Sequence, residues 1–223
     1  MKILAIDSST EVCSVALGNG AAIYQEENRS RAGHSQMILE LVARVLDETQ
    51  EALGNLDLIA VDVGPGSFTG LRIGLGVAKG IAYASRLPVV GISSLEILSQ
   101  QSPAGIAAPA IDARMGEVYN AVYEVKPDSR PSVIGSVHVL NPEDVDLPVS
   151  GHVTGLGSGW DNYAEAMLQL GQENICILAN RVPQARDLVR LAALTNREDW
   201  VSAVDLEAAY VRDRVVQLST PPA

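Results

Sequence analysis

The sequence predicts an α/β protein built from two similar lobes, and three observations lead to this prediction. A short apolar run that ends in Ile-Asp occurs twice, at residues 2–7 and 106–112. A glycine-rich turn also occurs twice, at residues 64–67 and 155–159. The same alternation of strand-like and helix-like segments surrounds both pairs. Two pairs of echoes in the same order indicate a duplicated fold.

The first half of the chain begins with three strand-like segments. These segments, residues 2–7, 13–17 and 22–26, are separated by turn residues, which predicts a three-stranded meander. Apolar residues from Met37 to Leu46 then follow helical spacing, and Ser35 is the expected N-cap. The elements expected next are a buried strand at 56–63, a helix at 71–85, a strand at 88–92 and a short helix at 94–101.

The second half is expected to repeat this order. Strands are predicted at 106–112, 117–125 and 132–137, and a helix start at Asn141-Pro142. Helices are predicted at 161–170 and 184–195, separated by a short apolar run at 175–178. We therefore expect a first lobe over residues 1–103 and a second lobe over residues 104–195. The segment 196–223 is expected to return to the first lobe and to end in a frayed tail.

Composition and charge exclude several classes of protein. The chain has 16 Lys and Arg against 27 Asp and Glu, so its formal net charge is −11. A protein that binds tRNA by itself needs clustered cations, and anionic lipid would repel this chain. An early carboxylate interrupts any signal peptide, and no run of about 18 apolar residues follows. We expect a cytoplasmic protein with no direct tRNA binding, no membrane binding, and reduced Cys13 and Cys176.

Aspartates and glycine turns at the strand ends of two lobes are typical of the actin, hexokinase and Hsp70 (ASKHA) ATPase fold. In such a fold, turns and helix starts hold phosphates by backbone N–H groups. The candidate nucleotide or phosphate contacts are Asp7, Ser8, Ser9, Gly64, Gly66, Ser67, Gly155 and Gly157. The alternative is that the glycines pack helix on sheet and that Asp7 caps its own turn. Arg114 stands where a second phosphate hairpin would need glycine, so we expect weak phosphate binding.

The helix expected at residues 71–85 carries a second kind of candidate site. Arg72 and Lys79 are its only charges, and small residues follow one another at i, i+4 and i+8. A helix without a polar face must be covered on both sides, and so large an apolar patch is unusual on a monomer. We expect a partner interface made by Met37, Leu39, Leu41, Val45, Arg72, Gly76, Lys79, Gly80 and Ala84. The alternative is that another helix of the same chain covers this face.

Seven stretches together resemble the TsaB family of bacterial tRNA threonylcarbamoyladenosine synthesis. They are residues 4–10 (LAIDSST), 34–35 (HS), 64–74 (GPGSFTGLRIG), 78–80 (AKG), 91–95 (GISSL), 112–114 with 117–119 (DAR, EVY) and 210–213 (YVRD). The stretch at 64–74 is the most specific of them. Ala209 and Val211 depart from the Pro-Tyr-Leu-Arg that the family usually has near its end.

The resemblance implies a protein that is not itself an enzyme. The catalytic relative in this pathway, TsaD, holds its metal by two histidines at i and i+4 of one helix. Here Ile38 stands four residues after His34, so no metal site is expected. The resemblance also implies that the chain binds and activates TsaD through its first lobe, that the ATPase subunit TsaE joins them, and that the chain alone is a homodimer. ATP or ADP is a candidate ligand at the complex interface, and an independent phosphotransferase is the alternative function.

Overall fold

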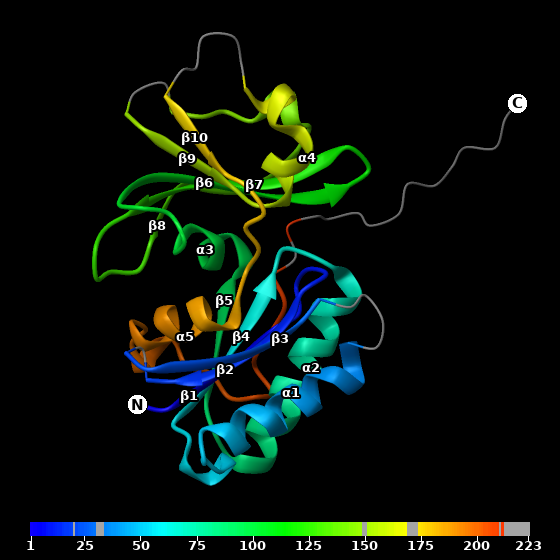
Figure 1. The fold of residues 1–223 in the computed structure, drawn as a ribbon, viewed down its shortest axis with the longest axis vertical. Coiled ribbons are helices and arrows are strands. Elements are labelled where there is room, and N and C mark those ends of the chain that lie inside the picture. Colours follow the sequence, from blue (N-terminus) through cyan, green and yellow to red (C-terminus); the bar gives the residue numbers. More distant parts are fainter. Residues whose placement is uncertain (20, 30–33, 149–150, 169–173, 210, 212–223) are drawn as a thin grey trace, which may run out of the picture.

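Two five-stranded sheets, one in each lobe, form the framework of the molecule (Figure 1). The computed structural model describes residues 1–19, 21–29, 34–148, 151–168, 174–209 and 211, without the side chains of residues 34–36. The expected frayed tail and most of the 210–213 stretch lie outside the described residues. No helix in the described part of the chain is long and apolar enough to span a bilayer.

The first sheet has the strand order β3-β2-β1-β4-β5. Its strands are β1 (Ile3–Asp7), β2 (Cys13–Gly18), β3 (Ile23–Asn28), β4 (Leu58–Gly64) and β5 (Val89–Ser93). The strand β1 is antiparallel to β2 and parallel to β4. The helix α1 (His34–Glu48) leads from β3 toward β4, and α2 (Phe68–Ser85) joins β4 to β5. Ser35 is not the N-cap of α1, because the helix already includes His34.

The second sheet repeats this topology in the order β10-β9-β6-β7-β8. Its strands are β6 (Gly105–Arg114), β7 (Glu117–Val125), β8 (Ser132–Leu140), β9 (Val153–Leu156) and β10 (Ile175–Leu178). The strand β6 is antiparallel to β7 and parallel to β9, as β1 is to β2 and β4. The helix α4 (Ser158–Met167) corresponds to α2, while a single 3-10 turn (Pro142–Asp144) stands in the place of α1. The predicted duplicated two-lobe α/β fold is confirmed.

Helices cover both faces of the first sheet (Figure 1). The helices α1 and α2 pack on one face, and α5 (Ala185–Ala193) packs on the other, where it buries Leu188 against Ile3 and Leu58. The bridge between Val89 and Val201 keeps the following segment beside β5. Placing residues up to 195 in the second lobe is therefore wrong for α5, because its apolar face completes the core of the first sheet.

A short buried helix, α3 (Ser94–Ser99), ties the two lobes together. Its Leu95 and Leu98 pack against the second sheet, while Ile97 packs against the first. Because all six residues of α3 are buried, the helix gains stability from both cores rather than from its own length.

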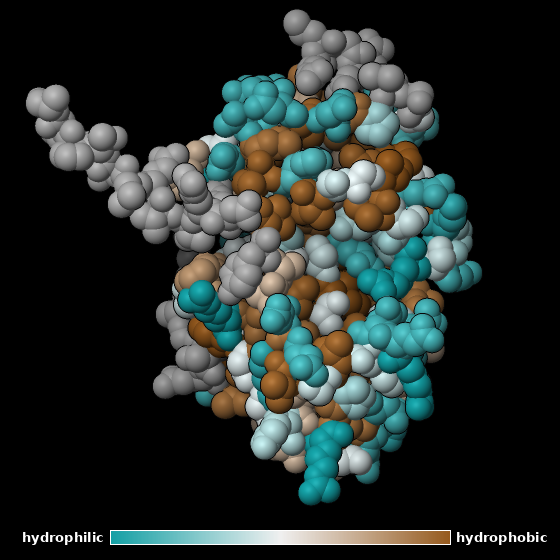
Figure 2. Space-filling view, turned by 180° about the vertical axis from the view of Figure 1, so that it is seen from behind, coloured by the Kyte–Doolittle hydropathy of each residue, from teal (hydrophilic) through white to brown (hydrophobic). Residues whose placement is uncertain are grey.

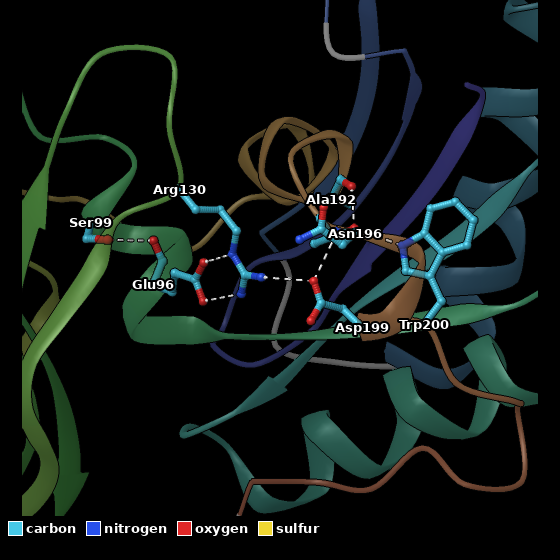
Figure 3. A network of polar contacts seen from close by, with 8 residues as sticks. Glu96, Ser99, Arg130, Ala192, Asn196, Asp199 and Trp200 are labelled. Carbon is cyan, nitrogen blue, oxygen red and sulfur yellow. Dashed lines mark hydrogen bonds and ion pairs between the residues drawn. The ribbon is translucent and has the colours of Figure 1, made fainter.

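An ion network reinforces this junction (Figure 3). Glu96 of α3 accepts two hydrogen bonds from the Arg130 guanidinium, at 2.6 and 3.0 Å. Arg130 comes from the loop between β7 and β8, and its third nitrogen lies 3.9 Å from Asp199 in the C-terminal segment. The network thus joins the second lobe to α3 and to the chain that returns to the first lobe.

Candidate functional site

A cleft of about 880 Å³ lies between the two lobes. The first lobe lines it with the β1–β2 turn around Ser9 and with residues 65–69. The second lobe lines it with the β6–β7 turn around Arg114 and with the start of α4. In Figure 2, which shows the molecule from behind, apolar residues gather over the upper lobe and around the middle of the molecule. The topology therefore brings the two predicted turns of residues 8–10 and 112–115 to one cavity.

The glycine turn of the first lobe is packed tightly against the β1–β2 turn. The Ser67 N–H donates to the Ser9 carbonyl oxygen at 2.7 Å, and the Ser8 hydroxyl donates to the Gly70 carbonyl oxygen at 2.8 Å. A Cβ on Gly66 would collide with that Ser9 oxygen. These glycines are required because only a residue without a side chain permits the two backbones to come so close.

This packing places some of the candidate phosphate contacts of the first lobe at the cleft and buries the others away from it. Ser9, Gly66 and Ser67 line the cleft, whereas Asp7 and Ser8 are buried and do not line it. Gly64 is also buried and does not line it. The Ser9 N–H already donates to the Asp7 carboxylate at 2.9 Å. The first turn therefore offers few free N–H groups to an anion.

The corresponding turn of the second lobe has also used its backbone donors. The Arg114 N–H donates to the Asp112 carboxylate at 2.8 Å, and the Asp112 N–H donates to the Ser158 hydroxyl at 3.0 Å. Asn162 binds the other oxygen of Asp112 at 3.0 Å. Because the N–H groups of Ser9 and Ser67 in one turn, and of Asp112 and Arg114 in the other, are already bonded inside the protein, these four donors are not available to a nucleotide triphosphate.

The second glycine turn holds a tryptophan rather than facing the cleft. A Cβ on Gly155 would lie 2.6 Å from the Trp160 ring, and one on Gly157 would collide with the Ala110 carbonyl oxygen. The Trp160 indole N–H donates to the Ala108 carbonyl oxygen at 2.6 Å. Neither Gly155 nor Gly157 lines the cleft. Their place in the structure is the contact between α4 and β6.

The outward side of α1 and α2 is the second candidate site. Leu39 on α1 is 55% exposed and Tyr83 on α2 is 76% exposed. A Cβ on Gly76 or Gly80 would meet no atom of the described residues within 4 Å, and both glycines are exposed. Arg72 and Ala84 are also exposed, Lys79 is half-buried, and the Arg72 guanidinium lies 3.6 Å from the centre of the Phe68 ring.

Two residues of the predicted interface lie in the core instead of on the surface. Leu41 and Val45 are only 1% and 0% exposed, because they pack into the core between α1 and the first sheet. The prediction that they face a partner is therefore wrong. Met37 is half-buried against the same core, and Ile38 is fully buried in it. We define the α1–α2 face as the outward residues Leu39, Arg72, Gly76, Lys79, Gly80, Tyr83 and Ala84.

Comparison with known proteins identifies the family. The family model described as TsaD, tRNA N6-adenosine threonylcarbamoyltransferase, matches residues 27–167, more than half of the chain. The protein named tRNA threonylcarbamoyladenosine biosynthesis protein TsaB of Escherichia coli is 35% identical over 99% of both chains. The chain belongs to the TsaB family. The Haemophilus influenzae TsaB protein is 32% identical, with 99% of this chain and 98% of the relative covered.

A solved structure supports the same assignment for this TsaB-family chain. A Pseudomonas aeruginosa protein, described as similar to the peptidase YeaZ, superimposes with a TM-score of 0.87 at 38% identity. The match covers 95% of this chain and 99% of that protein.

Three features of this TsaB-family chain were missed by the sequence analysis. Tyr83 extends the α1–α2 face, and its signal was a large aromatic residue beside the small-residue stripe. Asp62, at the end of β4, is buried with Asp7, and its signal was a carboxylate inside an apolar strand. The Glu96–Arg130 pair left no local signal, since its partners are 34 residues apart.

Proposed function

We propose that this TsaB-family chain serves tRNA threonylcarbamoyladenosine synthesis as a non-catalytic subunit that binds and activates TsaD. The names of its relatives support a place in this pathway. The observation that carries the subunit role is the α1–α2 face, which has exposed Leu39 on α1, exposed Tyr83 on α2 and two exposed glycines on α2. Exposed glycines on α2 permit a second pair of helices to approach closely.

The non-catalytic role is supported by the positions where catalysis would need side chains. Ile38, the residue that stands where TsaD has its second histidine, is fully buried in the core. A backbone donor of each cleft turn is bonded internally, the Ser67 N–H in the first lobe and the Arg114 N–H in the second. Because the chain has a net charge of −11, it acts on tRNA only through a partner that makes the contacts with the RNA.

The same face supports a homodimer when TsaD is absent, because two copies can pair α1 and α2 with each other isologously. The ATPase subunit TsaE joins the complex after TsaD has bound. ATP or ADP at the complex interface belongs to this proposal, with the partner supplying the donors that the cleft of this chain lacks.

Two substitutions test the interface. Gly76→Leu and Gly80→Leu would fill the open space on α2, so binding to purified TsaD is expected to be lost while the circular dichroism spectrum is unchanged. Gly54→Leu is the matched control, since Gly54 also has nothing within 4 Å of its Cβ position and lies outside both helices. Pull-down and light scattering report the complex, and modification of tRNA by TsaD with each variant reports activation. A complex that survives both α2 substitutions would place the interface elsewhere.

The alternative, an independent phosphotransferase, makes a separate prediction. It requires ATP turnover by the purified chain alone, with loss of turnover in Asp7→Ala. Turnover that meets both conditions would replace the subunit role, while no turnover agrees with the bonded turns described above.

A further inference from the structure

Two buried aspartates lie side by side at the ends of the central strands. Asp7 ends β1 and Asp62 lies near the end of β4, one step beyond the paired residues Ile6 and Val61 in the parallel register. Alternate residues of both strands, such as Ala5 and Ala60, pack toward α5. Because side chains alternate along a strand, both carboxyl groups point to this same face of the sheet.

Within the described part of the chain, each carboxyl group has one oxygen that accepts hydrogen bonds and one oxygen without a donor. Asp7 Oδ1 accepts from the Ser9 N–H at 2.9 Å and from the Ser9 hydroxyl at 2.8 Å. Asp62 Oδ1 accepts from the Gly64 N–H at 2.7 Å and from the Ser94 hydroxyl at 2.6 Å. The Oδ2 atoms of both aspartates are buried, and no donor among the described residues reaches either of them.

The two carboxyl groups lie at neighbouring positions of paired strands and on the same face of the sheet, so that the charge of Asp62 acts on Asp7. Two ionised carboxylates are acceptors only, so such a pair repels unless one of the two carries a proton. One proton would satisfy both remaining oxygens at once, one as a donor and the other as an acceptor.

We propose that Asp7 and Asp62 share a single proton in the folded chain, with Asp7 as the donor, and that this O–H···O bond ties β1 to β4 beneath the cleft. The bond would connect three segments of the chain through the hydrogen bonds that the two aspartates accept. Asp7 holds the turn at Ser9, while Asp62 holds the Gly64 turn before α2 and Ser94 at the start of α3. The pair thus fixes the turn at Ser9, which lines the cleft, without a ligand.

The electrostatic surroundings assign the proton to Asp7. Burial, followed by the charge of Asp62, raises the pKa of Asp7 well above its ordinary value. Burial also raises the pKa of Asp62, but its hydrogen bonds from Ser94 and Gly64 act in the opposite direction. Asp62 is therefore the better anion and the acceptor of the shared proton.

Charged groups on the neighbouring elements are already paired or neutral. Cys13 on β2 is neutral at pH 7, since the pKa of its thiol is raised to about 12, chiefly by burial. Glu96 on α3 is paired with Arg130.

The other helices add no unpaired carboxylate to this environment in the described part of the chain. Asp187 on α5 is paired with Arg190, and Arg186 is hydrogen-bonded to Gln25. On α2, Arg72 is exposed and lies over Phe68, and Lys79 is half-buried on the outward side.

The shared proton predicts a particular pH dependence of stability. Asp7 is protonated in the folded chain and ionised in the unfolded chain at any pH between about 4 and its native pKa. The contribution of protonated Asp7 to the free energy of unfolding is therefore complete below about pH 4, and it is lost as the pH rises through the pKa of Asp7 in the folded chain. In that window the unfolding equilibrium constant rises about tenfold per pH unit through this group alone.

Amide substitutions test the proposal, because an amide can donate one bond and accept another in the same geometry. Asp7→Asn should remove the tenfold-per-unit rise, since its NH₂ group donates to Asp62 at every pH. Asp62→Asn should also fold, with its NH₂ group donating to an ionised Asp7. The double variant Asp7→Asn/Asp62→Asn brings two NH₂ groups together, so its unfolding constant should exceed the product expected from the two single variants.

Two measurements decide the outcome. Urea unfolding of the wild type and the three variants between pH 5 and pH 8 gives the pH slopes and the double-mutant cycle. Infrared spectroscopy of the wild type at pH 7 should show the C=O stretch of a protonated carboxyl group, and Asp7→Asn should lack it. Equal pH slopes in the wild type and Asp7→Asn, additive effects in the double variant, or a missing carboxylic-acid band would each refute the shared proton. A shift of that band on adding Mg²⁺ would also refute it, because the pair would then be an accessible anionic site.

Discussion

Replacing Arg130 by Ala should destabilise the junction between the lobes by about 2–4 kcal/mol. Arg130 makes two charge-assisted hydrogen bonds to Glu96, at 2.6 and 3.0 Å (Figure 3). Hydrogen bonds to charged groups contribute about 1.5–3 kcal/mol each when solvent is excluded. Removing one partner of a fully buried pair costs about 3–5 kcal/mol, because the other charge is left uncompensated. The Arg130 side chain is 34% exposed, so we expect a cost about 1 kcal/mol smaller than that of a fully buried pair.

The measurement is urea unfolding at pH 7, followed by far-ultraviolet circular dichroism and by tryptophan fluorescence. Arg130→Lys is the matched control, because it retains the charge but cannot bind both oxygens of Glu96, and it should lose about half as much stability. In the background of Glu96→Ala the buried charge is gone, so Arg130→Ala should cost less than about 1 kcal/mol. A loss below about 0.5 kcal/mol in the wild-type background, or an unchanged loss in the Glu96→Ala background, would show that the network does not hold the lobes together.

Two further predictions concern tight packing and thiol chemistry. Gly155→Ala should destabilise the chain by about 1–3 kcal/mol in thermal unfolding, since its Cβ would lie 2.6 Å from the Trp160 ring. Gly76→Ala, in open space on α2, should instead stabilise the chain by about 0.5–1 kcal/mol. A Gly155→Ala variant that is more stable than the Gly76→Ala variant would contradict the packing described here. At pH 8 a thiol reagent should label exposed Cys176 rapidly and Cys13 only after unfolding, because burial raises the pKa of Cys13 to about 12; rapid labelling of both thiols in the folded chain would be inconsistent with it.

The sequence was most informative where one residue type permits one local geometry. The paired Ile-Asp runs and glycine turns predicted the duplicated sheets, and Gly66 and Gly157 lie at close backbone contacts. Apolar spacing separates the two sides of α1, because residues two apart on a helix point in nearly opposite directions. Leu41 shares the helical spacing of Ile38 and lies in the core, whereas Leu39 falls outside that spacing and is exposed, so the prediction that Leu41 faces a partner went against the spacing itself.

Long-range partners were beyond sequence reasoning for a physical reason. The apolar face of α5 shows that the helix must be buried, but it does not show which of two similar sheets it covers. The pairing of Glu96 with Arg130 depends on where a loop between β7 and β8 comes to lie. Both contacts are set by the packing of whole elements and leave no mark in the spacing of neighbouring residues.

The position of α5 has a consequence for how the chain is made. A growing polypeptide emerges N-terminus first, and 100 residues separate the last residue of β5, Ser93, from the last residue of α5, Ala193. At roughly 5–20 residues per second, the ribosome needs about 5–20 s to supply them. During that interval Ile3 and Leu58 have no α5 to cover them, although their strands have been synthesised. The nascent first lobe therefore presents an apolar sheet face to chaperones until the second lobe has been synthesised.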